Sequence, residues 1–484
     1  MYSKRTLKSS ILTIKSLQLN GLSTEEISVE STAIKGHKQL ILTGLPDAAL
    51  KDSKEKLKSI IHQHSQWDHS LKLLINLRPG EKVKSGSHLE LAIAIAALAA
   101  LNYQNLELSS RVFLQNNFFC GSLTLDGKII FCEGSEILAE LQDNVVSGYS
   151  FGNLRELWKF IINFNDLKSY RTKPKNINTN LTLKNSEVEE IHQRSWERFW
   201  IITASFYQLP IILMGPPGVG KSYLAKWSRH LLIKTNLEKN SQMKIIWKIY
   251  GKKNQNNWPI LNPHPRTNLS EFIGIHRSGI MRPGIYSLAH NGILILDEFT
   301  EMNRDTREYL RTIIENKSLF RNTTKGSLYW PADFWLILTT NPCQCGYSEG
   351  VNRSKCRCSP NTFNKYKDRL SGPIIDRMGV KLFLTNKDLY TNNISKSLCS
   401  LNHQQLQDLL KKTQEQIEAE DPPLEIKEKI KLMFPHINAR SLLLKTKIYH
   451  CGLTLTKNLN HQEKDFEKMF FIYMNQEEKY FENY

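Results

Sequence analysis

Residues 211–222 read IILMGPPGVGKS, an apolar strand-like run that leads directly into a glycine-rich loop. The loop matches the pattern G-x-x-x-x-G-K-[ST], and the residues that follow it, YLAKWSRHLLIK, have the apolar spacing of a helix. Glycines at three positions of the loop allow a tight turn whose backbone N–H groups face phosphate, and the helix adds its positive N-terminal end. A strand, a loop and a helix in this order predict a phosphate-binding loop.

The side chains at the end of this loop are the ones that contact phosphate and metal. Lys221 would reach the β- and γ-phosphates of a nucleotide, and Ser222 would ligate Mg²⁺. We therefore predict ATP and Mg²⁺ as cofactors. The residues expected to bind the nucleotide are Gly215, Pro216, Pro217, Gly218, Val219, Gly220, Lys221, Ser222 and Tyr223.

Two further apolar strands end in polar side chains. Asp297 and Glu298 follow the run ILIL, and Asn341 follows the run FWLILTT. Asp297 can hold the water shell of Mg²⁺, and Glu298 can polarise the attacking water. Asn341 can orient that water or the γ-phosphate. The alternatives are that the acidic pair caps the next helix and that Asn341 opens a turn.

The chain divides into four parts by its sequence patterns. Residues 1–163 mix strand-like and helix-like runs, and residues 164–186 are polar without an apolar period, as in a linker. Residues 187–385 alternate strands with helices, which predicts an α/β fold whose parallel sheet carries ligands at the carboxyl ends of its strands. Residues 386–484 are helical in pattern. Within the first part we expect strands at 39–45 and 71–77 and helices at 47–63 and 88–102.

The composition is that of a globular protein, since 40% of the residues are apolar and 23% are charged. The longest apolar run, Leu91–Leu101, is too short for a bilayer span of about 20 residues, so we predict no membrane partner. Eight cysteines in 484 residues make no disulfide framework, which favours a reduced, cytoplasmic setting. The net charge of +18 lies almost entirely after residue 150. Such an excess favours a polyanion such as nucleic acid as a partner, and the alternative is a solvated basic surface.

These motifs taken together resemble a known family. The phosphate loop, the acidic pair and the strand-terminal Asn, in this order, resemble an AAA+ ATPase. Further stretches resemble the ComM/YifB proteins of the magnesium-chelatase-like branch, and the resemblance covers essentially the whole chain. They are GLPDAALKDSKEKL (44–57), INLRPGEKVKSGSHLELAIAIAAL (75–98), GSLTLDGKI (121–129), RPGIYSLAHNGILILDE (282–298), NPCQCGY (341–347) and RLSGPIIDR (369–377).

This resemblance implies a hexameric ATPase, and the best-known members of the family drive branch migration of recombining DNA during natural transformation. It implies a Lon-protease-like (S5 domain 2-like) α/β domain in residues 1–163, followed after the linker by a P-loop AAA+ core and a C-terminal helical lid. Asn341 matches the sensor-1 position. Arg377 matches the arginine finger that reaches a neighbouring subunit's nucleotide, and Arg440 matches the sensor-2 arginine of the lid. For each arginine the alternative is a surface salt bridge.

The chain departs from the family pattern in several places. VEEIHQRSW (188–196) is a degenerate form of the box before the phosphate loop, and Gly379 replaces the usual acidic residue after the finger. In the Lon-like domain the family's nucleophilic Ser falls at His88, and no Lys lies between Cys132 and Ser150 to serve as its partner. A Ser–Lys dyad needs both groups, so we predict no proteolytic activity.

A cysteine quartet forms a second group of candidate ligands. Cys343 and Cys345 make one C-x-C pair, and Cys356 and Cys358 make a second. Ten residues separate the two pairs. Four thiolates can build a tetrahedral Zn²⁺ site, so Zn²⁺ is a further candidate cofactor. The alternative is four reduced thiols in a polar loop.

The leading hypothesis is an ATPase that couples hydrolysis to translocation on DNA, as a helicase or in branch migration, in a homo-oligomer expected to be a hexamer. Two alternatives stay open: a motor that remodels protein or inserts a metal ion, as chelatase subunits do, and a nucleotide-binding scaffold without turnover. Basic side chains interleaved with an aromatic suit single-strand binding. The candidate DNA contacts are Lys252, Lys253, His264, Arg266, Arg321, Lys325 and Trp330.

Overall fold

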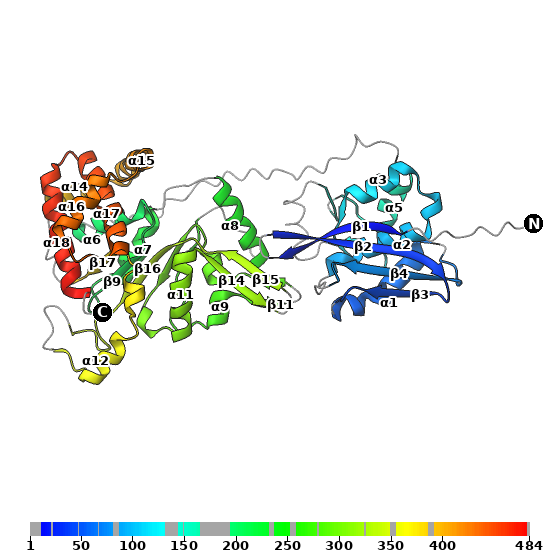
Figure 1. The fold of residues 1–484 in the computed structure, drawn as a ribbon, viewed down its shortest axis with the longest axis horizontal. Helices are drawn as coiled ribbons and strands as arrows, with labels where there is room; N and C mark the ends of the chain where they lie inside the picture. Colours follow the sequence, from blue (N-terminus) through cyan, green and yellow to red (C-terminus); the bar gives the residue numbers. More distant parts are fainter. Residues whose placement is uncertain are drawn as a thin grey trace, which may run out of the picture.

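The structure is a computed structural model whose described residues build two main sheets (Figure 1). The N-terminal sheet has one main hydrophobic core, and the second sheet has one on each face. Among these residues no helix combines the length and the apolar character needed to cross a bilayer. The structure describes residues 11–20, 23–46, 48–65, 67–80, 87–130, 144–148, 150–164, 194–231, 237–251, 258–277, 280–323, 326–348, 355–385 and 392–481.

The N-terminal sheet has six strands in the order β3-β4-β2-β1-β5-β8. One helix, α2, lies in its core, because every residue from Glu90 to Ala100 is buried and a helix that is apolar all round has no face for water. The expected strands and helices of this part are all present, as β3, β4, α1 and α2. The elements are β1 (Leu12–Asn20), β2 (Ser23–Lys35), β3 (Gln39–Thr43), α1 (Ala48–His64), β4 (Leu71–Arg78), α2 (Glu90–Leu101), α3 (Leu108–Asn116), β5 (Phe118–Phe119), β8 (Val145–Val146) and α5 (Leu154–Ile162), with the small ladder of β6 (Ser122–Leu123) and β7 (Ile129–Ile130).

The long antiparallel pair of β1 and β2 was absent from our expectations for this part. Its inward positions include serines, which interrupt the apolar alternation that identifies a strand. The hydroxyl of Ser16 is buried and donates to the carbonyl of Phe119 at 2.8 Å, and that of Ser31 donates to Ala96 at 2.7 Å. Each buried hydroxyl therefore has a hydrogen-bond partner, so these strands can bury serine. The same serines break the alternation of apolar residues from which the strands could have been predicted.

The second sheet has five strands in the order β10-β13-β16-β9-β17, and every neighbouring pair is parallel. All residues of β9, β13, β16 and β17 are buried, as expected of strands that are covered on both faces. The predicted parallel sheet is thus confirmed. Its strands are β9 (Ile211–Met214), β10 (Ile260–Leu261), β13 (Ile293–Leu296), β16 (Trp335–Thr340) and β17 (Val380–Phe383).

Helices cover both faces of the parallel sheet, and alternate residues of β9 enter separate cores on the two sides. Two hairpins, β11–β12 and β14–β15, accompany the helices. These elements are α6 (Ser195–Ser205), α7 (Lys221–Trp227), α8 (Leu237–Tyr250), α9 (Leu269–Ile273), β11 (Ile275–Arg277), β12 (Ile280–Arg282), α10 (Ile285–Leu288), α11 (Arg304–Asn316), β14 (Ser318–Thr323), β15 (Gly326–Pro331), α12 (Pro360–Lys367) and α13 (Gly372–Ile375).

The C-terminal part is helical, as its pattern predicts, and it shares a core with the parallel sheet. Trp200 stacks on Tyr473 with ring centroids 4.2 Å apart, and Phe383 stacks on Tyr480 at 4.0 Å. Among the aromatic side chains of the last helix, Phe471 is the one that is exposed. The helices are α14 (Asn393–Cys399), α15 (His403–Ala419), α16 (Leu424–Met433), α17 (Ala439–Asn458) and α18 (Glu463–Phe481).

The proposed boundaries between these parts fall in or next to segments that the structure leaves undescribed. Phe164 is buried in the N-terminal core, and the rest of the expected linker, 165–186, lies outside the described residues. Residue 386, where the helical part was expected to begin, also lies outside them. The division at 163, 186 and 385 therefore stays a prediction.

Candidate nucleotide-binding site

The glycine-rich loop leaves the carboxyl end of β9 and enters α7, as the motif predicts. A Cβ at Gly215 would lie 2.5 Å from the carbonyl oxygen of Leu384, so only glycine fits there. Gly218 and Gly220 have φ angles of +80° and +88°, which glycine adopts without strain. Apart from the adjacent residues of the loop, no atom lies within 4 Å of a Cβ built at either position, so the loop is unobstructed on that side.

Lys221 connects the glycine-rich loop to the predicted Asn341. Its Nζ donates to the carbonyls of Gly215 and Pro216, at 2.7 and 2.9 Å, and to Oδ1 of Asn341 at 2.9 Å. Burial lowers the pKa of Lys221 to about 8, against the opposing negative charges of Asp297 and Glu298. The lysine thus holds the loop and the strand-terminal Asn in contact.

The end of the glycine-rich loop also contacts the predicted acidic pair. The hydroxyl of Ser222 donates to Oδ1 of Asp297 at 3.1 Å, which joins the end of the loop to the end of β13. Thr339 of β16 donates its hydroxyl to the same carboxylate oxygen, and its Oγ1 accepts the backbone N–H of Glu298 at 3.2 Å. Hydroxyl and carboxylate oxygens are ligands that Mg²⁺ accepts, so Ser222 and Asp297 are placed to hold that ion.

Glu298 has a φ angle of +51°, which is unusual for a residue with a side chain. Such a conformation costs free energy, and it persists because neighbouring contacts impose it. A cavity of about 290 Å³ adjoins Glu298 and contains polar groups from three segments of the chain. Its lining residues are Glu298, Thr300, Glu301, Asn341, Gln344 and Tyr366.

Sequence reasoning missed Thr339 and most of this cavity. Thr339 belongs to a buried strand, where a β-branched residue is ordinary, so its polar role left no distinct signal. Tyr366 comes from α12, and its hydroxyl accepts a hydrogen bond of 2.6 Å from Thr300. Only the fold brings these side chains next to Glu298.

Arg377 lies at the amino ends of the parallel strands, whereas the phosphate loop lies at their carboxyl ends. It precedes β17, whose first residue pairs with the first residue of β9, whereas the loop follows the last residue of β9. The guanidinium is buried, and it pairs with the carboxylate of Glu315 and donates to the carbonyl of Pro373. The structure therefore does not bring Arg377 to Lys221 of its own chain.

Arg440 meets the same carboxylate. Its Nη2 lies 2.7 Å from Oε1 of Glu315, and half of its side chain is exposed at the start of α17. The two arginines hold the pKa of Glu315 below its ordinary value, although desolvation opposes them. The structure thus gathers both predicted arginines around Glu315, which the sequence did not single out because a Glu near the end of an exposed helix is common.

The residues proposed to contact DNA have mixed outcomes. His264 and Arg266 are exposed after β10, whereas Lys252, Lys253, Lys325 and the side chain of Arg321 lie outside the described residues. The prediction that Trp330 stacks on bases is wrong, because the side chain is 1% exposed and belongs to the core. The exposed aromatics of that hairpin are instead Phe320 and Tyr329, which pair across β14 and β15.

Comparisons with known proteins fit this geometry. A family model described as magnesium chelatase, subunit ChlI, matches residues 189–391, and a second, described as subunit ChlI of Mg-chelatase, matches residues 29–145. YifB of Escherichia coli is 29% identical over 382 residues, and the competence protein ComM of Haemophilus influenzae is 27% identical over 387. The chain belongs to the magnesium-chelatase-like ComM/YifB family.

The ComM/YifB relatives align over most of their own length. The alignments cover 75% of this chain with 73% of YifB and 74% of ComM. An uncharacterised protein of Mycobacterium tuberculosis is 27% identical over 395 residues, with 76% of this chain and 75% of that protein covered. The magnesium-chelatase-like family is of the AAA+ type, which implies ATPase activity with ATP and Mg²⁺ and commonly an oligomer.

The lowered pKa of Lys221 predicts a pH dependence of nucleotide binding. Below about pH 8 the ammonium is protonated and attracts phosphate, and this attraction is lost as the pH rises above 8. Because bound phosphate favours the charged lysine, we expect ATP affinity to fall by up to about tenfold for each pH unit above 8. Titrations with a fluorescent ATP analogue between pH 7 and 9.5 measure this slope. The Lys221→Ala variant should bind weakly with a flat profile, and a flat profile in the wild type would contradict the assignment.

Proposed function

We propose that this chain is a cytoplasmic, hexameric ATPase that couples ATP hydrolysis to translocation on DNA, as a helicase or branch-migration motor in recombination during natural transformation. One observation carries the proposal furthest. Lys221 contacts Asn341, and Ser222 contacts Asp297, at the carboxyl ends of the parallel strands, where a nucleotide would bind. Catalytic roles follow from their chemistry: Lys221 for phosphate, Ser222 and Asp297 for Mg²⁺, and Asn341 beside Glu298 for the attacking water.

The position of Arg377 supports an assembly. Its guanidinium lies at the amino ends of the strands, whereas the chain's own phosphate loop follows their carboxyl ends. As a finger, Arg377 would therefore leave its ion pair with Glu315 and contact a nucleotide held by another copy. Such a head-to-tail contact closes into a ring when the rotation between copies allows it. We propose that Arg440 reaches the same neighbouring nucleotide, because it shares Glu315 with Arg377.

The domain assignment is part of the proposal. Residues 1–163 would form a Lon-protease-like domain without proteolytic activity, joined by a linker at 164–186 to an AAA+ core at 187–385. Residues 386–484 would form the helical lid. The mixed sheet of the first part and the helices after residue 392 support this division.

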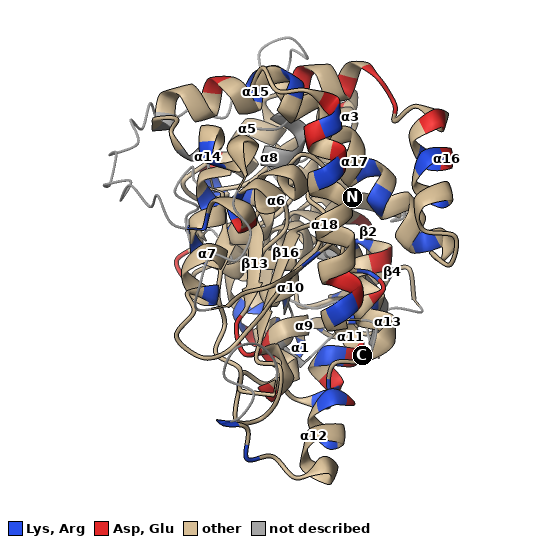
Figure 2. Cartoon of the chain, turned by 90° about the vertical axis from the view of Figure 1, so that its left-hand side faces the viewer, with Lys and Arg blue, Asp and Glu red and all other residues tan. Residues whose placement is uncertain are grey.

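DNA as the partner is supported by the hairpin of β14 and β15. Phe320 and Tyr329 are directly opposite in its register and are more than half exposed, as a stacking platform for bases requires. Basic charge alone supports it less, since Lys and Arg are interspersed with acidic residues along the helices on the side shown in Figure 2. The name of the Haemophilus relative, a competence protein, agrees with a role in the uptake of DNA.

Replacing Phe320 and Tyr329 together by Ala should weaken DNA binding by about tenfold or more, because each stacked base contributes about 1–3 kcal/mol. Basal hydrolysis should persist, since neither side chain touches the nucleotide site. Fluorescence anisotropy with single-stranded DNA measures the affinity. Tyr309→Ala, which removes an exposed aromatic from α11, is the matched control. Unchanged DNA affinity in the double variant would exclude the hairpin as the contact.

The proposed function is tested by the response of ATP hydrolysis to DNA. We expect single-stranded or forked DNA to stimulate turnover, with a steep loss of stimulation as salt rises, because binding releases counterions from phosphates. A helicase assay on a forked duplex then measures unwinding. Turnover that ignores DNA at every salt concentration would contradict the proposal.

A second candidate is an ATP-driven motor that remodels a protein or inserts a metal ion and has no activity on DNA. The observation that favours it is the match to the magnesium chelatase subunit model, which spans the whole nucleotide-binding part. It predicts hydrolysis that is stimulated by a protein partner and is unaffected by nucleic acid.

A further inference from the structure

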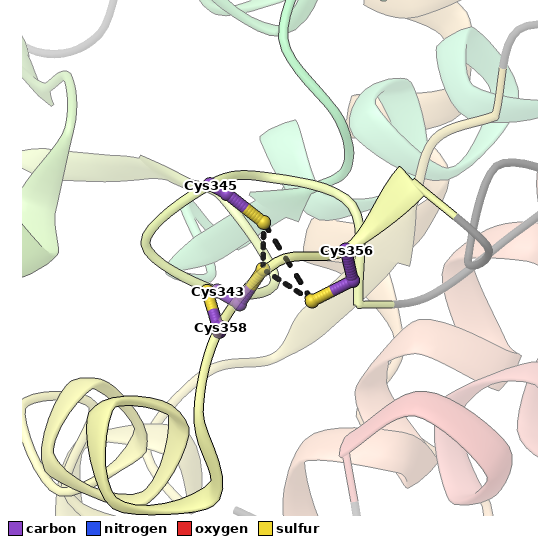
Figure 3. Close-up of side chains that lie close together, drawn as sticks. All are labelled: Cys343, Cys345, Cys356 and Cys358. Atoms are coloured by element: carbon purple, nitrogen blue, oxygen red, sulfur yellow. Dashed lines mark hydrogen bonds between the residues drawn. The ribbon is translucent and has the colours of Figure 1, made fainter.

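The four cysteines beside the nucleotide site lie together in space. Cys343 and Cys345 follow β16 directly, and Cys356 and Cys358 precede α12 (Figure 3). All four sulfur atoms lie within 4.8 Å of one another. Cys343 is buried and the other three are partly buried, so the cluster is shielded without being sealed. Two separate stretches of chain therefore converge on one point through their sulfur atoms.

The spacing of the sulfurs matches a metal site. Cys343 Sγ lies 3.3 Å from Cys345 Sγ and 3.9 Å from Cys356 Sγ. The sulfurs of Cys345 and Cys356 are 3.6 Å apart. A tetrahedral Zn²⁺ with sulfur ligands at about 2.3 Å holds those ligands about 3.8 Å from each other. A disulfide would instead need about 2.0 Å. Three of the sulfurs are thus spaced close to the ligands of one tetrahedral ion, and Cys358 Sγ lies within 4.8 Å of each of them.

A backbone N–H group already supports one sulfur ligand that carries negative charge. The N–H of Ser348 donates to Cys343 Sγ at 3.2 Å. Such an N–H donor stabilises a thiolate and orients it toward a metal.

We propose that Cys343, Cys345, Cys356 and Cys358 bind one structural Zn²⁺, and that this ion holds residues 343–346 against the phosphate loop. Four protein ligands leave no open position for water, so the ion would stabilise structure and take no part in catalysis.

The second half of this proposal rests on the proposed nucleotide site and on two residues next to the ligands. Gly346 has a φ of +85°, and a Cβ on it would lie 2.5 Å from Cδ of Pro217 in the phosphate loop. Gln344 lines the cavity that also contains Glu298 and Asn341. Because the zinc ligands flank Gln344 and precede Gly346, the ion would fix both residues where the nucleotide binds.

Metal analysis of the full-length protein, purified under reducing conditions without chelator, tests the first half. We expect about one zinc per chain, released when a mercurial reagent titrates the thiols. The Cys356→Ser/Cys358→Ser variant should contain less than about 0.2 zinc per chain, and Cys120→Ala, which changes a buried cysteine outside the cluster, should keep the full content. Wild-type protein that contains less than about 0.1 zinc per chain, and takes up none when incubated with Zn²⁺, overturns the proposal whatever the variants do.

Nucleotide binding tests the second half separately. Removing the metal should weaken binding of a fluorescent ATP analogue by about tenfold. Gln344 and Gly346 would then have to be ordered on binding, which costs binding free energy. Lys221→Ala should lose nucleotide binding and keep its zinc, so failure of the nucleotide site and failure of the metal site give different results. Full zinc content together with an ATP affinity that is unchanged on metal removal would overturn the link to the phosphate loop.

Discussion

Replacement of Glu298 by Gln should lower the rate of ATP hydrolysis by about 100-fold or more while ATP still binds, as for loss of a general base. The amide has the shape of the carboxylate and cannot take a proton from water. The backbone that positions it is unaffected, because the N–H of residue 298 donates to Thr339 in either case. Single-turnover hydrolysis and binding of a fluorescent nucleotide measure the two steps independently.

The matched control for this variant is Glu308→Gln. Glu308 is an exposed carboxylate on α11, so the same chemical change there should leave turnover near that of the wild type. If Glu298→Gln kept more than about half of the wild-type rate, Glu298 would not be the general base. If it lost ATP binding as well, the residue would position the loop and not the attacking water.

Replacement of Arg377 by Ala should reduce turnover by about 10³-fold or more, which is the scale of an arginine finger that acts in trans. ATP binding should remain, because the guanidinium lies at the opposite edge of the sheet from Lys221. Arg377→Lys should recover little of the rate, since an ammonium lacks the planar fork that contacts two phosphate oxygens. Steady-state hydrolysis at protein concentrations that permit assembly is the measurement.

Glu315→Gln separates a finger from a structural ion pair. Arg377 is buried and pairs with Glu315, so a loss of activity in Arg377→Ala could reflect damage to the fold. Glu315→Gln breaks the same ion pair and retains both arginines. If the pair is merely structural, the two variants should lower the melting temperature and the activity alike. If Arg377 is a finger, only Arg377→Ala should abolish turnover.

The sequence revealed the parts of the site that depend on local backbone. Glycines at fixed spacing, and acids or Asn directly after buried strands, identify a phosphate loop and its partners because the carboxyl ends of parallel strands meet at one edge. The contacts of Lys221 with Asn341, and of Ser222 with Asp297, show that these strand ends do meet. The family resemblance was likewise confirmed by the matches of the family models.

Other features depend on contacts between distant segments, which no local pattern contains. The partnership of Glu315 with two arginines joins α11, the end of α13 and α17, and its sequence context is that of an ordinary surface Glu. Trp330 was misread for a related reason. Successive side chains of β15 point to opposite faces, so Tyr329 faces solvent and Trp330 faces the core. Which of the two is exposed depends on the pairing of Tyr329 with Phe320 in the hairpin, and the sequence of β15 alone does not contain that pairing.

The account depends most on a site shared between two copies of the chain, and mixing two inactive variants tests it most directly. Lys221→Ala cannot bind nucleotide but keeps Arg377, whereas Arg377→Ala binds nucleotide but lacks the finger. Each should be inactive alone, and a mixture should hydrolyse ATP because one copy supplies the arginine for the other copy's nucleotide. The account predicts activity that rises on mixing and reaches a maximum near equal amounts. A mixture that stays as inactive as its components, although the two proteins assemble together, would contradict it.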